Sequence, residues 1–270
     1  MKKSTLIFLL SFFYIGIIFS QEKNQITYIA NEGVFIEYNG KHVFIDALHD
    51  EHSNFYEHTR KPYRLIMNNA SAPFERIDLF LVTHVLGDHF DADLTIEFFE
   101  KHKETILVAP QQVLDTIGTL AHLAAQFYPL KGTDNGVMYA MDGITIQTFP
   151  LIYSTSKENN WLENMAYILD FDGLKILHAG DAEFSPENLS RIKKAIGKGV
   201  DYAILPDWFF ENKEGIAKVK RQIKAKKYIA AHVLKSKSAI YSNLLKKRVK
   251  EFDMDLTVFL SVGQFETIKK

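Results

Sequence analysis

Two histidines and an aspartate lie within six residues of one another at the end of an apolar segment. The segment Leu79–Val82 is typical of a strand buried on both faces. The residues that follow it are Thr83, His84, Val85, Leu86, Gly87, Asp88 and His89. Imidazole nitrogen and carboxylate oxygen are the ligands that hold Zn²⁺ or Fe²⁺ in proteins. The pattern therefore predicts a metal-binding loop, and the alternative is a strand end with an ordinary solvated polar loop.

Two later strand ends add residues of the same kind, namely the segment Ile176–Asp181 (ILHAGD) and the segment Ala230–His232 (AAH). Together these motifs resemble the metallo-β-lactamase-fold hydrolases, whose signature is T/S-H-x-H-x-D-H, followed by a Gly-Asp pair and a strand-ending histidine. The resemblance extends from Ile26 to Phe265. It is closest to the lactonase-like branch in Ile45-Asp46, in PFERIDLFLVTH and in LHAGD.

The resemblance implies one intact metal site made of Asp88, His89, Asp181 and His232. Two imidazoles and two carboxylates suit a single divalent cation, for which we favour Zn²⁺ over Fe²⁺ or Mn²⁺. In the family the aspartate at the position of Asp181 bridges two metals.

The other site of the family lacks two of its ligands in this chain. Leu86 stands where the motif has its second histidine, and the segment Pro150–Ser156 has Tyr153 or Ser154 where a third histidine is expected. Leucine binds no metal, and tyrosine binds one poorly at neutral pH because its pKa is about 10. Only His84 remains, which predicts a mononuclear centre.

A metal-activated water attacking a lactone, amide or phosphoester follows from this ligand set. Asp88 or Asp181 would take the proton, His84 would hydrogen-bond the water or the carbonyl, and Tyr153 or the metal would stabilise the oxyanion. The main alternative is a non-catalytic binding protein that keeps the fold and at most one metal. A redox or oxygen-handling metalloprotein is a third reading, although such relatives keep a fuller ligand set.

Loops at the same strand ends should line a pocket for a small-molecule substrate. The residues predicted to bind substrate are His49, Tyr153, Ser154, Trp208 and Lys235.

The residues between the opening strands and the metal-binding loop lead to further expectations. The polar loop Ala47–Phe74 carries His49, His52 and His58, which we expect to be solvated, with one of them at the substrate mouth. Asp46 has two readings, a support for the metal loop and a simple strand-end aspartate.

The order of apolar runs predicts the fold. A β-rich start is followed by alternating strands and helices, then by a second β-rich stretch and a second alternation. Two similar halves of this kind indicate an αββα four-layer sandwich, an α/β fold of two mixed sheets face to face with helices outside. The resemblance implies the same architecture.

The 270 residues have a formal net charge of -1 and no cysteine, which argues against non-specific nucleic-acid binding and excludes thiolate ligands. Lys2, Lys3 and the apolar run Leu6–Phe19 predict a signal peptide over residues 1–20, with an uncleaved anchor as the alternative. Residues 21–270 would then form a single periplasmic or secreted domain, without stable membrane insertion after cleavage. The sequence does not indicate an oligomeric state.

Overall fold

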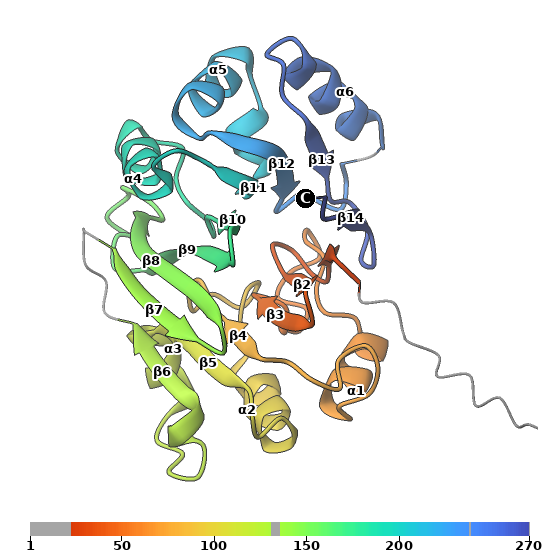
Figure 1. Cartoon of the computed structure of the whole chain (residues 1–270), viewed down its shortest axis with the longest axis vertical. Helices are drawn as coiled ribbons and strands as arrows, with labels where there is room; N and C mark the ends of the chain where they lie inside the picture. The colour runs from red at the N-terminus through yellow and green to blue at the C-terminus, as the bar shows by residue number, and fades with distance from the viewer. Residues whose placement is uncertain (1–22, 131–135, 238, 270) are drawn as a thin grey trace, which may run out of the picture.

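The computed structural model describes residues 23–130, 136–237 and 239–269, and these form two seven-stranded sheets packed face to face (Figure 1). Both sheets are mixed, so the predicted αββα sandwich is confirmed. The predicted leader, residues 1–20, lies outside the described residues. In the part of the chain that is described, no helix combines the length and apolar character needed to cross a bilayer.

The first sheet has the strand order β14-β1-β2-β3-β4-β5-β6. Its pairs are antiparallel from β14 to β3 and parallel from β3 to β6. The strands are β1 (Gln25–Tyr28), β2 (Val34–Tyr38), β3 (Lys41–Ile45), β4 (Leu79–Leu81), β5 (Ile106–Pro110), β6 (Phe127–Leu130) and β14 (Phe265–Thr267).

The second sheet has the order β13-β12-β11-β10-β9-β8-β7, antiparallel from β7 to β10 and parallel from β10 to β13. Its strands are β7 (Val137–Met141), β8 (Ile144–Ile152), β9 (Glu163–Phe171), β10 (Leu174–His178), β11 (Val200–Pro206), β12 (Ala225–Ala231) and β13 (Leu256–Val258). The parallel strands in each sheet bring their carboxyl ends to one edge, where the predicted ligands follow them.

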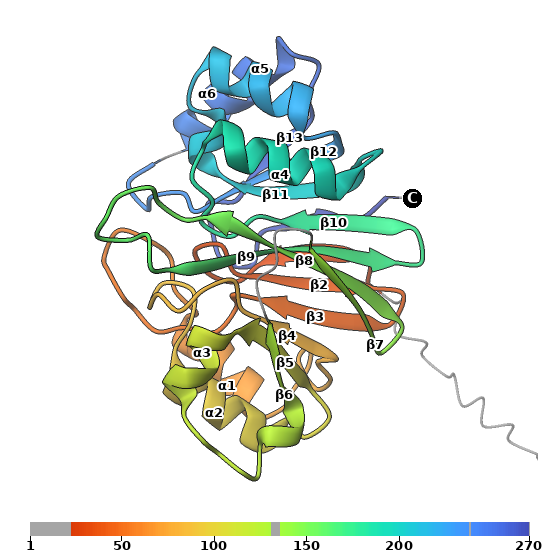
Figure 2. The ribbon, with the colours of Figure 1, turned by 90° about the vertical axis from the view of Figure 1, so that its left-hand side faces the viewer.

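Helices form the two outer layers (Figure 2). One group covers the first sheet and consists of α1 (Lys61–Asn68), α2 (Ala92–Lys101) and α3 (Gln111–Ile117). The other covers the second sheet and consists of α4 (Pro186–Ile196), α5 (Lys213–Gln222) and α6 (Ala239–Lys250). The inner faces of both sheets share one apolar core that includes Ile45, Leu81, Tyr167 and Ile204.

Four elements differ from the sequence prediction. Helix α1 lies inside the segment predicted to be a polar loop, where its only buried residue is Met67. Strands β6 and β7 lie in a stretch whose sequence shows no clear alternation of apolar and polar residues. Strand β14 pairs antiparallel with β1 and so joins the two ends of the described chain.

Tyr167 on β9 ties the second sheet to the first directly beneath the metal loop. Its side chain is fully buried, and its hydroxyl donates a hydrogen bond to the Val82 carbonyl oxygen at 2.6 Å. Two residues earlier, the Met165 amide donates to the Thr83 carbonyl oxygen at 2.9 Å. These two hydrogen bonds hold the start of the loop after β4 at a fixed distance from the second sheet.

We predict that Tyr167→Phe lowers the free energy of unfolding by about 1–3 kcal/mol, because the variant deprives the buried Val82 carbonyl of this donor. Urea denaturation followed by circular dichroism measures the effect. Tyr139→Phe, at a partly exposed position of the same sheet, should change the value by less than about 0.5 kcal/mol. Equal stability of Tyr167→Phe and wild type would contradict the role assigned to this bond.

Candidate metal centre

Four side chains from distant parts of the sequence meet at the carboxyl edge of the two sheets. Ligand atoms of Asp88, His89, Asp181 and His232 all lie within 4.8 Å of one another. Asp88 and His89 belong to the loop after β4, while Asp181 follows β10 and His232 follows β12. The structure thus brings together all four residues that the sequence predicted to bind the metal.

Three of the distances between these atoms match those between ligands around one cation. His89 Nε2 lies 3.2 Å from Asp181 Oδ1, and His232 Nε2 lies 3.2 Å from Asp181 Oδ2 and 3.5 Å from Asp88 Oδ2. Ligands about 2.1 Å from a tetrahedral Zn²⁺ are about 3.4 Å apart. Within the described chain, buried Asp181 Oδ1 and both ring nitrogens of His232 also lack a hydrogen-bond partner of good geometry. The residues present therefore fit a divalent cation.

The buried carboxylate of Asp46 orients His89. It accepts hydrogen bonds from the Thr83 amide (2.8 Å) and the Thr83 hydroxyl (2.5 Å), and it contacts His89 Nδ1 at 2.8 Å. Burial would raise the pKa of Asp46, but the hydrogen bond and the charge of His89 lower it, so the carboxylate is ionised and Nδ1 must donate. Nε2 of His89 then faces the centre. Of the two readings of Asp46, the structure supports that of a support for the metal loop.

A second support comes from the turn between β1 and β2. The Asn31 side chain donates to Asp88 Oδ2 at 3.2 Å, and its backbone oxygen accepts from the His232 amide at 3.0 Å. His232 has a φ of +57°, a left-handed conformation that is costly for a histidine. One asparagine therefore holds both the loop after β4 and the residue after β12.

Gly180 is required by a close approach of chains. Its φ is +55°, and an added Cβ would meet the Asn164 side-chain oxygen and would lie 2.9 Å from the Thr83 Cβ. Because glycine has no side chain, the end of β10 can pack closely against Thr83 of the metal loop, directly before Asp181.

Two further side chains, His84 and Tyr153, lie beside the four predicted ligands. His84 Nε2 is buried, lacks a hydrogen-bond partner in the described chain and lies 3.9 Å from Asp181 Oδ2. The Tyr153 ring lies 5.5 Å from the His84 ring. Burial and the charges of Asp181 and Asp88 raise the pKa of Tyr153, so its hydroxyl is neutral and is a poor ligand.

A cavity of about 440 Å³ reaches the metal centre at Asp181 and His232. Aromatic rings form two of its walls, because Tyr56 and Trp208 both meet the His232 ring edge-on, with centroids 4.3 Å and 5.0 Å away. The lining residues are Tyr56, Tyr153, Ser154, Asn159, Asp181, Glu183, Phe184, Trp208 and His232.

Three of the predicted substrate-binding residues, Tyr153, Ser154 and Trp208, line this cavity, whereas His49 and Lys235 do not. The expectation of a solvated His49 is wrong, because its side chain is buried and its Nδ1 lies 3.1 Å from the Asp50 carbonyl oxygen. Burial lowers the pKa of His49 to about 4. Lys235 points instead toward Glu51, with 3.7 Å between the charged groups.

The sequence reading missed Asn31, Glu32, Tyr56 and Glu183. Glu32 is 1% exposed, and neither of its carboxyl oxygens has a hydrogen-bond partner in the described chain. Burial, followed by the charge of Asp181, raises the pKa of Glu32 well above its usual range. The sequence signal for Asn31 and Glu32 is weak, because Asn-Glu-Gly between two apolar strands is also typical of a simple turn.

The sequence profile of the Beta-lactamase superfamily domain matches residues 25–232, which is most of the chain. The chain belongs to this superfamily. The lactonase-like branch within it stays a prediction. A comparison with curated proteins finds no match.

Solved structures share the fold at low sequence identity. The metallo-β-lactamase fold protein YhfI from Bacillus subtilis is 12% identical with a TM-score of 0.64, over 90% of this chain and 98% of that one. A metallo hydrolase from Ignicoccus hospitalis, Igni18, is 18% identical with a TM-score of 0.60, over 91% and 98%. An isothiocyanate hydrolase from Delia radicum gut bacteria is 15% identical with a TM-score of 0.61, over 90% and 99%.

We predict that metal uptake releases about two protons per ion. Burial would lower the pKa of His232 and of His89, but Asp181 raises that of His232 to about 10 and that of His89 well above its usual range. Both imidazoles are thus charged at pH 7 without metal and must be neutral to bind one. Affinity should therefore increase as the pH rises from 7 toward about 10.

Calorimetric titration with Zn²⁺ in buffers of different ionisation enthalpy counts these protons. The same charges stabilise the metal-free fold below the ordinary histidine pKa of about 6.5, and that contribution is lost as the pH rises through the raised values. A heat of binding that is independent of the buffer would contradict the charged state of the two histidines.

Proposed function

We propose that this protein is a hydrolase that uses one divalent cation, Zn²⁺ before Fe²⁺ or Mn²⁺, and acts on a small uncharged or cationic lactone or amide. The proposal is supported chiefly by one observation: four ligand atoms lie within 4.8 Å of one another, and two of the four residues, Asp181 and His232, line a cavity of about 440 Å³. We also propose that the chain is exported, on the strength of residues 1–20. A soluble small molecule is the expected partner, and no nucleic acid is expected at this site.

The protein's own residues would prepare the attacking water. The Thr83 hydroxyl has one proton, which it donates to Asp46, so it accepts from Nδ1 of His84, 2.9 Å away. Burial lowers the pKa of His84 to about 4, which leaves the ring neutral with a lone pair on Nε2. That nitrogen can accept a hydrogen bond from water, and Asp88 or Asp181 can take the proton. A bound divalent cation would lower the pKa of the water and polarise the substrate carbonyl.

Tyr153 would complete the reaction as a donor. Because its hydroxyl is neutral, it can hydrogen-bond an oxygen on which negative charge develops. Its position between His84 and the cavity suits this role.

The charge of the cavity bears on the class of substrate. Its lining includes the carboxylates of Asp181 and Glu183, and no lysine or arginine is among the described lining residues. One Oε atom of Glu183 accepts from the Thr155 hydroxyl at 2.9 Å, while the other is buried without a partner. A bound divalent cation would offset the charge of Asp181, so the repulsion of an anionic substrate would come from Glu183. This carboxylate favours substrates that are uncharged or cationic on the side of the cavity lined by Glu183.

We predict one metal per chain in the wild type, because His84 and a share of Asp181 fall short of the roughly three protein ligands that a catalytic site needs. The double variant Leu86→His/Tyr153→His should take up a second ion. Elemental analysis after equilibration with Zn²⁺ gives the ratio, and Asp181→Asn should take up none while its circular dichroism stays native. A wild-type ratio near two would show that another residue completes the second site, and a ratio near zero would favour the non-catalytic protein.

We predict hydrolysis of an uncharged p-nitrophenyl ester at a rate at least tenfold above that of a p-nitrophenyl phosphodiester. His84→Phe should keep its metal but lose about tenfold or more in kcat, because it removes the nitrogen that accepts a hydrogen bond from the water and puts no acceptor in its place. Ser156→Ala, at the rim of the loop, serves as the matched control. Full metal occupancy without turnover of any ester, lactone, amide or phosphoester would instead indicate a binding protein.

A further inference from the structure

The near-zero net charge of the chain conceals two oppositely charged parts. Residues 171–270 hold 20 of the 32 lysines and arginines but only 12 of the 33 aspartates and glutamates. The rest of the chain holds the other 12 basic and 21 acidic residues. Asymmetry of this kind is typical of proteins that meet an anionic surface with one side.

The basic residues gather at the edge opposite the metal centre. Strands β10, β11 and β12 are parallel, so their amino ends share one edge, while Asp181 and His232 follow their carboxyl ends. Three adjoining hollows of about 480, 250 and 540 Å³ lie along this amino edge. We call their lysines the lysine surface: Lys175, Lys198, Lys220, Lys224, Lys226, Lys227, Lys246, Lys247, Lys250 and Lys269.

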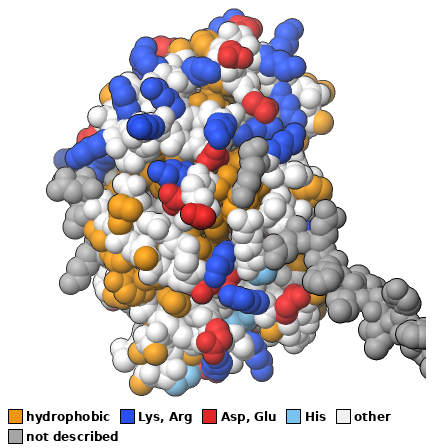
Figure 3. Space-filling model, in the orientation of Figure 1, with side chains coloured by type: hydrophobic (Ala, Val, Ile, Leu, Met, Phe, Trp, Pro, Cys, Tyr) orange, Lys and Arg blue, Asp and Glu red, His pale blue; other side chains and the backbone are white. Residues whose placement is uncertain are grey.

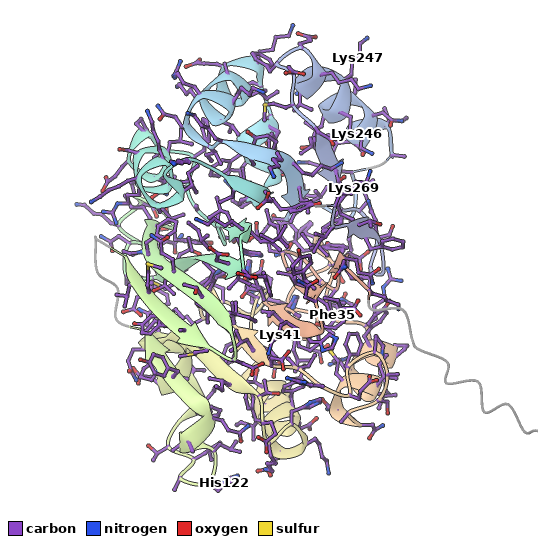
Figure 4. All side chains as sticks on the ribbon, in the orientation of Figure 1. Phe35, Lys41, His122, Lys246, Lys247 and Lys269 are labelled. Carbon is purple, nitrogen blue, oxygen red and sulfur yellow. The ribbon has the colours of Figure 1, made fainter. Side chains whose placement is uncertain are left out.

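The figures show the same arrangement. In Figure 2 the C-terminus and the turn between β9 and β10 lie at one edge of the sheets, and the view of Figure 3 faces that edge. Lysine and arginine side chains are densest there over the upper part, where α4, α5 and α6 lie. Figure 4 places Lys246 and Lys247 on α6 and Lys269 beside β14 on the same side.

Few of these lysines are neutralised within the protein. Three of the ten form ion pairs: Lys226 with Asp201 at 2.7 Å, Lys227 with Asp255 at 2.9 Å and with Glu266 at 3.5 Å, and Lys175 with Asp170 at 3.8 Å. By contrast, Lys198, Lys224 and Lys246 are exposed and form no ion pair within the described residues. The lysine surface therefore keeps a large excess of positive charge for a partner.

The position at which the apolar leader joins the domain indicates which kind of partner the lysine surface binds. The Ile268 amide donates to the Asn24 carbonyl oxygen at 2.9 Å, and the Lys269 amide donates to the Tyr202 hydroxyl at 2.9 Å. Lys269 and Tyr202 line the middle hollow. The run Leu6–Phe19 is thus followed, a few residues later, by a residue beside the lysine surface. During export, before the leader is cleaved, the membrane-bound run would bring this side of the domain to the lipid headgroups, and an uncleaved anchor would keep it there.

We propose that the lysine surface docks on a membrane rich in anionic phospholipids. The bond is electrostatic, between lysine ammonium groups and lipid phosphates. Docking by the amino edge leaves the metal cavity, at the carboxyl edge, facing the aqueous phase where a soluble substrate arrives. The proposal does not depend on the hydrolase activity.

Vesicle sedimentation tests it with the chain from Gln21, which keeps every strand and helix of the structure but lacks the apolar leader. We expect binding to phosphatidylglycerol vesicles and none to phosphatidylcholine vesicles, with loss of binding in 0.5 M NaCl because salt screens exposed charges, roughly within 5 Å at that strength. The triple variant Lys198→Gln/Lys224→Gln/Lys246→Gln should bind about tenfold or more weakly.

The triple variant Lys61→Gln/Lys101→Gln/Lys157→Gln is the matched control, because it makes the same change in net charge on exposed lysines outside the lysine surface. It should bind as the wild type does. Equal weakening of both variants, or no binding to anionic vesicles, would overturn the proposal. Tighter binding to duplex DNA or to polyphosphate than to vesicles, at equal phosphate concentration, would also overturn it in favour of a soluble polyanion.

Discussion

The buried carboxylate of Asp46 is the interaction on which the metal centre depends. An ionised carboxylate that is removed from water costs several kcal/mol unless it is surrounded by donors. Asp46 has three of them, the amide and hydroxyl of Thr83 and the ring of His89. Its φ of +48° shows that the end of β3 adopts an unfavourable backbone conformation to present this carboxylate. The loop after β4 is therefore shaped around the end of β3.

The same carboxylate determines where protons lie on two histidines. It accepts directly from His89, and it takes the single proton of the Thr83 hydroxyl, which leaves that oxygen to accept from His84. In both rings Nδ1 then carries the proton and Nε2 is turned to the centre. The hydrogen bonds of Asp46 thus have two effects: they shape the loop after β4, and they present two imidazole nitrogens to one point.

The ligands could be predicted because the motifs around them resemble those of a known superfamily and each motif follows an apolar strand. Asp181 and His232 follow parallel strands of one sheet, whose carboxyl ends share an edge. Asp88 follows a strand of the other sheet, so only the resemblance linked it to them. Asn31 could not be found in this way. Its contact with Asp88 spans 57 positions and depends on where β1 lies in the sheet order, which apolar patterns do not encode.

The prediction for the segment Ala47–Phe74, a polar loop with solvated histidines, was wrong for a different reason. Its composition is polar, and composition describes a whole segment, whereas burial is a property of single side chains. His49 lies under the loop and is buried, while His52 is exposed with its ring against Gly87 of the metal loop. Helix α1 was missed because it buries one residue, so it leaves almost no apolar periodicity to read.

The fold itself accounts for part of the difference between its two edges. Helices α4, α5 and α6 end at the amino edge, and basic residues in their last turns, such as Lys220, Lys247 and Lys250, are favoured by the negative end of each helix dipole. Lys198 and Lys224 directly follow the C-caps of α4 and α5, so the dipoles favour them as well, whereas Lys269 follows β14 and gains nothing from a helix end. A helix dipole carries only about half a charge at its end, far less than the summed charge of these lysines. Their charge adds self-repulsion without a partner inside the chain, which is why the excess at this edge points to a partner outside it.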